Sequence, residues 1–160
     1  MLILGIETSC DETSASIVEN GTKILSNVIA SSQELHIKTG GIIPEMAARK
    51  QVRCMMPIIK ETMQQGNNAT MKNIDAIAVT VGPGLIGSLL VGVETAKALV
   101  YLWNKPIIPV NHLLAHVYAN WLDKNVPSFP LIALIVSGGH TELILMKDHG
   151  KHEWLGGTRD

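Results

Sequence analysis

The first thirty residues carry the pattern that most constrains the fold, which is a series of short apolar segments separated by turn signals. Residues 2–6 and 14–18 are apolar runs of strand length with a polar loop between them. Asn20-Gly21 then gives a strong hairpin signal, because both residue types tolerate a positive φ angle. With a third predicted strand at 23–30, the chain is expected to open with three antiparallel strands.

Helix-like and strand-like segments alternate after this opening. Helix formers predict a helix over 45–65, in which Pro57 is expected to cause a kink or a split. The apolar stretch 85–103 predicts a second helix, and Asn111 is a candidate cap for a third that ends near residue 122. Buried strands are expected at 74–81 and 106–110. The alternation points to an α/β fold, a mixed sheet with flanking helices.

The end of the chain is similar to its beginning. Strands are expected at 131–136 and 141–147, with a third beginning at 152–155 and a loop over 156–160. Ile132 follows Ile3 by 129 residues, as Gly150 follows Gly21, whereas Thr13 and Thr141 differ by 128 and require one gap.

We interpret this similarity as a duplicated lobe. Residues 1–125 are assigned to a first lobe, and residues 126–160 to a linker and the opening strands of a second. A sheet that begins so late still needs a helix on its face, so we expect a truncated protein.

Composition narrows the class of protein. Hydrophobic residues make up 46% of the 160 residues and charged residues 17%, which fits a packed globular chain. A net charge of −1 excludes a global basic field for nucleic acid. Cys10 and Cys54 form no disulfide framework and no export signal precedes them, so we expect reduced thiols in the cytoplasm. Glu94 and Lys97 interrupt the longest apolar stretch, which favours a buried helix over a membrane span.

A histidine pair is the strongest candidate for a metal site. His112 and His116 are four residues apart on a predicted helix, so they share one face and can converge on a metal. Two polar positions on a helix edge are the alternative. A third ligand is also needed, and Asp11, His140 and Asp160 are weak candidates within the chain.

The same pair allows a comparison with zinc peptidases. Those enzymes use His-Glu-x-x-His, in which the glutamate activates water. Leu113 occupies the glutamate position here, so the general base is missing and a zinc peptidase becomes the weaker interpretation.

Three glycine-containing or polar loops are candidate anion sites. The loop Ser137–Thr141 contains two glycines, whose backbone N–H groups could approach a phosphate, and Ser9–Thr13 is its counterpart in the first lobe. Plain hairpin turns are the alternative for both. Gly82–Ser88 could hold an anion at a helix N-terminus or could serve close packing.

A basic edge on the helix 45–65 is a further candidate surface. We expect a solvated face by default, with RNA or a partner protein as the minority interpretation. Its members are Arg49, Lys50, Arg53 and Lys60. Cys10 lies beside Asp11 without a histidine nearby in the sequence, which favours loop packing over nucleophilic catalysis.

Taken together, these segments resemble the TsaD family of tRNA adenosine threonylcarbamoyltransferases, once named O-sialoglycoprotein endopeptidases. The matching segments occur in order over essentially the whole chain and correspond to about the N-terminal half of the family's usual length. They are Gly5–Thr13, Gly41 with Pro44-Glu45, Gly82-Pro83-Gly84-Leu85, Asn111-His112 with His116, and Val136–Thr141.

The resemblance implies an actin-like, sugar-kinase-like (ASKHA) fold of two lobes. It implies transfer of threonylcarbamoyl from threonylcarbamoyl-AMP to N6 of the adenosine 3′ of the anticodon, in tRNAs that read ANN codons. It also implies one divalent metal, Fe²⁺ or Zn²⁺, on His112 and His116, with the third protein ligand outside this chain. The implied partners are tRNA, a paralogous subunit in a heterodimer and an accessory ATPase, without a membrane.

The resemblance also assigns residues. The adenylate-binding glycine loop maps to Ile135, Val136, Ser137, Gly138 and Gly139. Asp11 and Glu12 match the family's acidic loop and are our candidate catalytic residues, with their exact role left open. The fragment alone is expected to be inactive. The alternatives are a metal-dependent glycoprotein endopeptidase and a non-catalytic heterodimerisation module.

Overall fold

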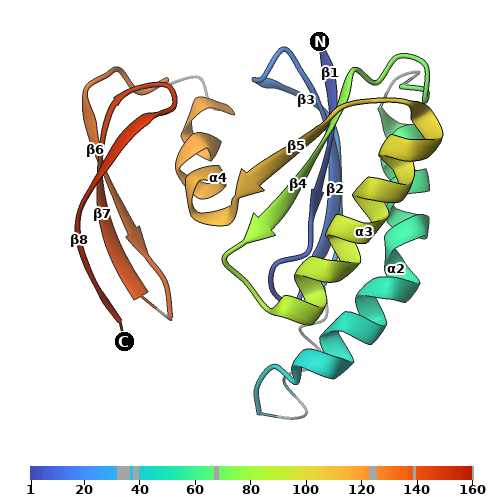
Figure 1. The fold of residues 1–160 in the computed structure, drawn as a ribbon, viewed down its shortest axis with the longest axis horizontal. Coiled ribbons are helices and arrows are strands. Elements are labelled where there is room, and N and C mark those ends of the chain that lie inside the picture. The colour runs from blue at the N-terminus through green and yellow to red at the C-terminus, as the bar shows by residue number, and fades with distance from the viewer. Residues whose placement is uncertain (32–36, 38–39, 67–68, 123–125, 139, 160) are drawn as a thin grey trace. The chain divides into compact units, whose positions relative to one another are not determined.

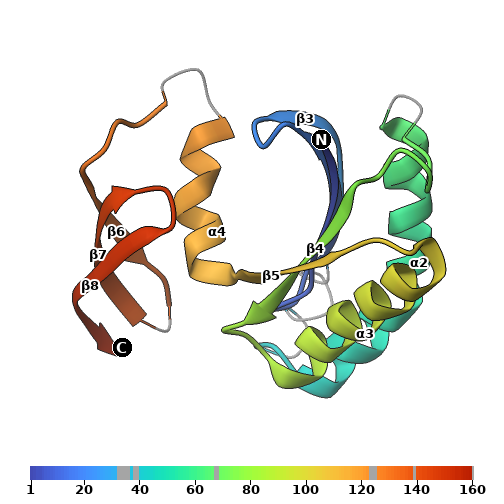
Figure 2. The same cartoon turned by 45° about the horizontal axis from the view of Figure 1, so that its top comes forward.

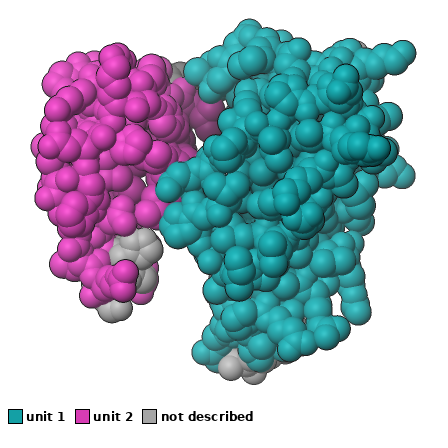
Figure 3. Space-filling model, in the orientation of Figure 1, with its two compact units in different colours: residues 1–112 teal, residues 113–160 magenta. Residues whose placement is uncertain are grey.

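The computed structural model describes residues 1–31, 37, 40–66, 69–122, 126–138 and 140–159. The chain forms two compact units, Met1–His112 and Leu113–Asp160, which Figure 3 shows in different colours. The helical segment after His112 packs its apolar side chains against the strands that follow it, and so belongs to the second unit. The assignment of lobes to residues 1–125 and 126–160 stays a prediction.

A five-stranded mixed sheet forms the centre of the first unit. Its order is β3-β2-β1-β4-β5 (Figure 1). The predicted antiparallel opening is confirmed, because β1 pairs with β2 and β2 with β3, and Asn20 and Gly21 adopt φ angles of 54° and 81° at the turn. β4 and β5 run parallel to β1. The bounds are β1 Leu2–Glu7, β2 Thr13–Glu19, β3 Lys23–Ala30, β4 Ala76–Gly82 and β5 Ile107–Asn111.

Two helices cover one face of this sheet (Figure 2). They are α2, Pro44–Gln65, and α3, Ile86–Trp103. The core between helices and sheet is aliphatic, and its largest fully buried side chains include Leu4, Ile17, Met55, Ile74 and Ile77. An α/β fold with a mixed sheet and flanking helices is therefore confirmed.

Pro57 does not split α2, so that part of the prediction is wrong. A proline inside a helix removes one backbone hydrogen bond and crowds the preceding turn. Here the helix buries side chains on both sides of the proline, and this packing holds the two halves in one element. Those residues are Ala47, Gln51, Met55, Ile58, Ile59 and Thr62.

Among the described residues, α3 is the one helix that is long and apolar enough to cross a membrane by length and composition. It packs in the first unit instead, with Leu89, Ala96 and Leu99 buried toward the sheet and α2. Glu94 and Lys97 form an exposed ion pair at 2.7 Å on its outer side. The expected burial holds for this inner face only, because apolar side chains on the rest of α3 are exposed, among them Ile86, Leu90, Tyr101 and Leu102.

The second unit is a three-stranded antiparallel sheet with a short helix. Its order is β6-β7-β8. Val117 and Trp121 from the helical segment pack with Ile144 and Met146 of β7. The bounds are α4 His112–Tyr118, the 3-10 helix η1 Ala119–Leu122, β6 Leu131–Val136, β7 His140–Asp148 and β8 Lys151–Arg159.

The two three-stranded sets correspond closely in position. The first runs from Leu2 to Ala30 and the second from Leu131 to Arg159, so both ends are separated by 129 residues. The loop expected at 156–160 is wrong for residues 156–159, because they pair with β7 and extend β8. Gly157 permits the close pairing, since a Cβ there would lie 2.6 Å from the Thr141 carbonyl oxygen.

Candidate functional site

The carboxyl ends of three parallel strands meet at one edge of the first sheet. β1 ends at Glu7, β4 at Gly82 and β5 at Asn111, and β4 lies between the other two. Ligands of open α/β sheets bind in the crevice outside such carboxyl ends. Side chains at this edge are therefore placed where a site is expected on topology alone.

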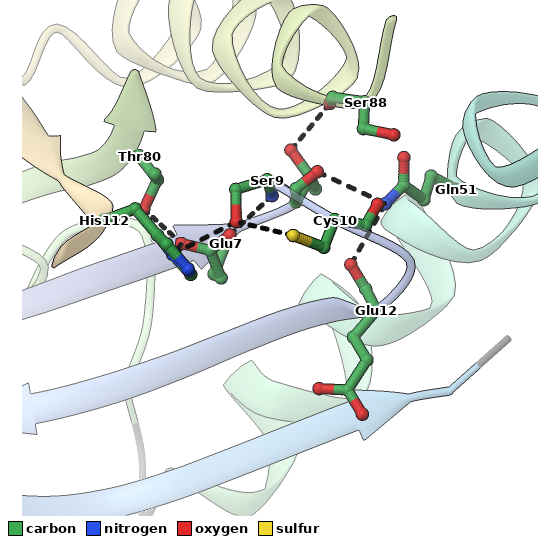
Figure 4. A network of polar contacts seen from close by, with 9 residues as sticks. Glu7, Ser9, Cys10, Glu12, Gln51, Thr80, Ser88 and His112 are labelled. Atoms are coloured by element: carbon green, nitrogen blue, oxygen red, sulfur yellow. Dashed lines mark hydrogen bonds and ion pairs between the residues drawn. The ribbon is translucent and has the colours of Figure 1, made fainter. Parts of the chain in front are cut away.

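A carboxylate and an imidazole meet at this edge, as Figure 4 shows. Oε2 of Glu7 lies 3.4 Å from Nδ1 of His112, and Oγ of Ser9 lies 3.1 Å from the same nitrogen. Thr80 donates its hydroxyl hydrogen to Oε2 of Glu7, and the Ser9 backbone N–H donates to Oε1. Since an ionised carboxylate only accepts hydrogen bonds, this setting favours the tautomer with hydrogen on Nδ1.

The Glu7 carboxylate is held in its charged form. Partial burial raises the pKa of Glu7, but the hydrogen bonds from Ser9 and Thr80, with the nearby His112, outweigh burial and hold it below its usual range. The side chains of Glu7 and His112 are 33% and 22% exposed, so both lie at the rim of the core. The result is an ionised acceptor beside one ring nitrogen.

The loop that follows β1 is held from both helices. Thr8 donates its hydroxyl hydrogen to the Ser88 carbonyl of α3 at 2.7 Å, and the Leu85 N–H donates to the Ser9 carbonyl at 2.7 Å. From α2, the side-chain amide of Gln51 reaches carbonyl oxygens of the same loop. The loop is thus fixed at the edge where Glu7 and His112 meet.

The segment Gly82–Ser88 serves close packing, one of its two predicted roles. A Cβ at Gly84 would lie 2.5 Å from the Ser9 carbonyl oxygen and 2.7 Å from the Ser9 Cβ. Only a glycine lets the two loops approach this closely. The segment therefore supports the loop that carries Ser9.

Asp11 and Glu12, the candidate catalytic residues, lie in this loop. The backbone carbonyl of Glu12 accepts a hydrogen bond from Gln51, while its carboxylate extends away from the Glu7–His112 contacts (Figure 4). Asp11 is partly exposed. Their catalytic role stays a prediction.

The histidine pair lies on α4 as predicted, with His112 at its first residue and His116 one turn later. Among the described residues, no group of three or more His, Cys, Asp or Glu side chains is arranged to hold a metal ion. The chemistry of the pair still fits part of a metal centre, because a ligating histidine commonly donates its other N–H to a carboxylate, as His112 is placed to do toward Glu7. The chain supplies two donors, and a complete set requires another.

The predicted adenylate loop lies in the second unit. Ile135 and Val136 end β6, and Ser137 and Gly138 follow them toward β7. Gly139 and Asp160 lie outside the described residues, as does the side chain of His140. A Cβ at Gly138 would meet no described atom within 4 Å, so internal packing does not require this glycine.

Two further predictions concern surface side chains. On α2, Arg49 pairs with Glu45 at 2.8 Å and Lys50 donates to the Ser31 carbonyl, which agrees with a solvated basic edge. Cys10 and Cys54 are free thiols, as expected.

Sequence reasoning missed Glu7, Thr80 and Gln51, and it placed Ser9 in a candidate anion loop without its contact to His112. One signal for Glu7 was present, since it is a charged residue directly at the end of a buried strand. The contacts of the other three depend on segments 39 to 103 residues away, which no local pattern reveals.

Sequence comparisons identify related proteins. The sequence model of TsaD, tRNA N6-adenosine threonylcarbamoyltransferase, matches residues 23–160. A tRNA N6-adenosine threonylcarbamoyltransferase of Thermomicrobium roseum is 53% identical over 166 residues, covering 100% of this chain and 45% of the relative. That of Staphylococcus saprophyticus is 57% identical, covering 99% and 46%. The chain thus spans about half the length of the curated relatives it matches.

Solved structures show the fold. YeaZ from Pseudomonas aeruginosa superposes with a TM-score of 0.64 at 14% identity, covering 99% of this chain and 68% of that one. The activator of 2-hydroxyisocaproyl-CoA dehydratase from Clostridium difficile, with bound ADPNP, gives 0.56 at 13% identity, covering 100% and 46%. These likenesses establish an actin-like, ASKHA-type fold.

Proposed function

Because this chain belongs to the TsaD family of tRNA N6-adenosine threonylcarbamoyltransferases, we propose that the full-length protein is such a transferase. It transfers threonylcarbamoyl from threonylcarbamoyl-AMP to N6 of the adenosine 3′ of the anticodon in tRNAs that read ANN codons. A bond forms between N6 and the carbamoyl carbon, and the bond from that carbon to the phosphate oxygen breaks. AMP leaves, and the amine gives up one proton.

The observation that carries this proposal is the match over residues 23–160, combined with the side chains gathered at the carboxyl edge of β1, β4 and β5. The family match supplies the reaction, and the edge supplies a polar constellation at the position where α/β sheets bind ligands.

The residues of the chain have distinct roles in this proposal. The backbone of Ile135–Gly139 binds the adenylate, where closely approaching N–H groups stabilise the departing phosphate. Asp11 and Glu12 are the candidate catalytic residues of the acidic loop. Glu7 and Ser9 orient His112 through its Nδ1.

His112 and His116 are the residues that would hold the divalent metal, either Fe²⁺ or Zn²⁺. When bound, the metal would supply Lewis-acid polarisation of the carbonyl group. Because His112 and His116 supply only two ligands, we assign the third protein ligand to the remainder of the full-length protein. Glu7 supports this assignment, because an outer carboxylate behind one imidazole raises its basicity as a ligand.

The proposed partners follow from the family. They are tRNA as acceptor, threonylcarbamoyl-AMP as donor, a paralogous subunit in a heterodimer, and an accessory ATPase. The likeness to YeaZ supports the paralogue, because it shows that the same fold occurs in a separate protein. We place the reaction in the cytoplasm, which agrees with two free thiols.

The test is a reconstituted transfer assay with the full-length protein. Unmodified tRNA, threonylcarbamoyl-AMP and the candidate partner subunits are mixed, and nucleosides are identified by mass spectrometry after digestion. The expected product carries the threonylcarbamoyl group on N6 of adenosine, and a matched tRNA with guanosine at that position stays unmodified. Cleavage of a glycoprotein substrate without nucleoside modification would support the endopeptidase instead.

A further inference from the structure

We propose that Gln51 is a positioning residue that sets the backbone of Cys10–Glu12, the loop segment that carries Asp11. The proposal rests on the proposed function for its effect on transfer, and on geometry alone for its effect on the loop. Gln51 lies on α2, and its side chain is fully buried.

The loop curls around the amide of Gln51. Nε2 lies 2.9 Å from the carbonyl oxygen of Cys10 and 3.1 Å from that of Glu12, with the carbonyl of Thr8 at 3.3 Å (Figure 4). Carbonyls of alternate residues therefore converge on a single nitrogen, which has two hydrogens to donate. One side chain thereby contacts three carbonyls within five consecutive residues.

The opposite helix holds a different part of the loop. Thr8 and Ser9 are bound to Ser88 and Leu85 at the start of α3. The carbonyls of Cys10 and Glu12 are held by Gln51 from α2. Loss of the Gln51 amide should therefore release Cys10–Glu12 and leave Thr8 and Ser9 anchored.

Side-chain packing alone does not explain a glutamine here. Within the described part of the chain, Oε1 of Gln51 is buried without a hydrogen-bond partner, which is unfavourable. Most other buried positions of α2 are apolar, and an unbranched apolar side chain would fill this space without the unpaired Oε1, but it would leave the loop carbonyls without their donor. The amide is better explained by what its nitrogen holds than by packing.

The test uses the full-length protein with Gln51→Met, which removes the donors and keeps an unbranched side chain. Thr62→Val is the matched control, because Thr62 is equally buried on α2 and donates one hydrogen bond, to the Ala15 carbonyl of β2. Amide hydrogen exchange of residues 8–12 and steady-state transfer are measured at a temperature where all variants are folded. Gln51→Asn, with the amide drawn back by one methylene, is the second variant.

The expected result is faster exchange over Cys10–Glu12 in both Gln51 variants, with kcat lowered between about 10-fold and 100-fold and KM for tRNA within twofold of wild type. Thr62→Val should change neither. Wild-type exchange in this segment, or a kcat equal to that of Thr62→Val, would overturn the proposal. If wild-type protein transfers nothing to tRNA, the proposed function fails, while the exchange data still decide whether Gln51 holds the loop.

Discussion

The hydroxyl oxygen of Ser9 lies 3.1 Å from Nδ1 of His112, although 103 residues separate them in the chain. Two parallel strands on either side of β4 cause this proximity. Ser9 follows β1 and His112 follows β5, so both leave the sheet at its carboxyl edge. Glu7 completes the arrangement by facing the same nitrogen.

The first prediction concerns the carboxylate behind His112. Glu7→Gln replaces an ionised acceptor by a neutral amide, so zinc affinity of the full-length protein should fall roughly 10-fold to 100-fold. Competition with a chromogenic chelator measures it. Glu19→Gln, which removes an exposed carboxylate paired with Lys23, is the control and should bind zinc as wild type does. Equal zinc affinity in wild type, Glu7→Gln and Glu19→Gln would contradict the proposed role of Glu7 in supporting the metal ligand His112.

The second prediction uses two glycines near the start of α3. Gly84→Ala forces a methyl group against Ser9 and should destabilise the protein by about 1–3 kcal/mol. Gly87 lies within α3, and the new methyl group of Gly87→Ala would lie 3.4 Å from the Cβ of Ala48 on α2. Because alanine is a better helix former than glycine, this variant should be neutral or stabilising by up to about 1 kcal/mol. Thermal unfolding of both variants gives the comparison. Equal melting temperatures would contradict the close approach of the two loops.

A third prediction separates ligand approach from packing in the second unit. Neither Gly138→Ala nor Gly156→Ala brings the new methyl within 4 Å of a described atom, so both should fold with nearly wild-type stability. If the backbone at Gly138 approaches the adenylate, Gly138→Ala alone should weaken AMP binding, by about 10-fold or more. Calorimetric titration with AMP measures this difference. If both variants bind AMP with wild-type affinity, Gly138 does not contact the adenylate.

The fourth prediction concerns pH and the β7–β8 turn. The backbone N–H of His149 donates to Asp148 at 2.8 Å, and this bond, together with Lys151, lowers the pKa of Asp148. Because the folded pKa lies below the ordinary value of 3.8, the carboxylate stabilises the turn above about pH 3.8. That contribution is lost as the pH falls through the folded pKa.

Asp148→Ala should therefore lower the melting temperature at pH 7, and its difference from wild type should narrow below about pH 3.8. Asp148→Asn, which keeps an acceptor oxygen and loses the charge, should lie between the two. The measurement is a series of melting curves at different pH values. A melting-temperature difference between wild type and Asp148→Ala that grows on acidification would contradict the lowered pKa of Asp148.

Features with a local cause were predictable from the sequence. The Asn20-Gly21 turn depends on the residue types at two positions, and the spacing of His112 and His116 depends on one helical turn. The strand and helix order followed from periodicity in the same way. These signals were sufficient for the fold class.

Features that depend on distant partners were not predictable. Pro57 is a local breaker, yet α2 continues because its flanking residues are buried against the sheet. Residues 156–159 look like a loop, yet they pair with β7. Gln51 stands beside the basic residues of α2 in sequence, and its role emerges only when that helix packs over the loop after β1.

Transfer to tRNA by the reconstituted full-length protein, compared between wild type and a His112→Ala/His116→Ala double variant, tests the central claim most directly. His152→Ala, on an exposed position of β8, is the matched control. Wild type and control should retain metal and form the N6-modified adenosine, whereas the double variant should lose both and still melt cooperatively. A double variant that transfers at the wild-type rate would contradict the account.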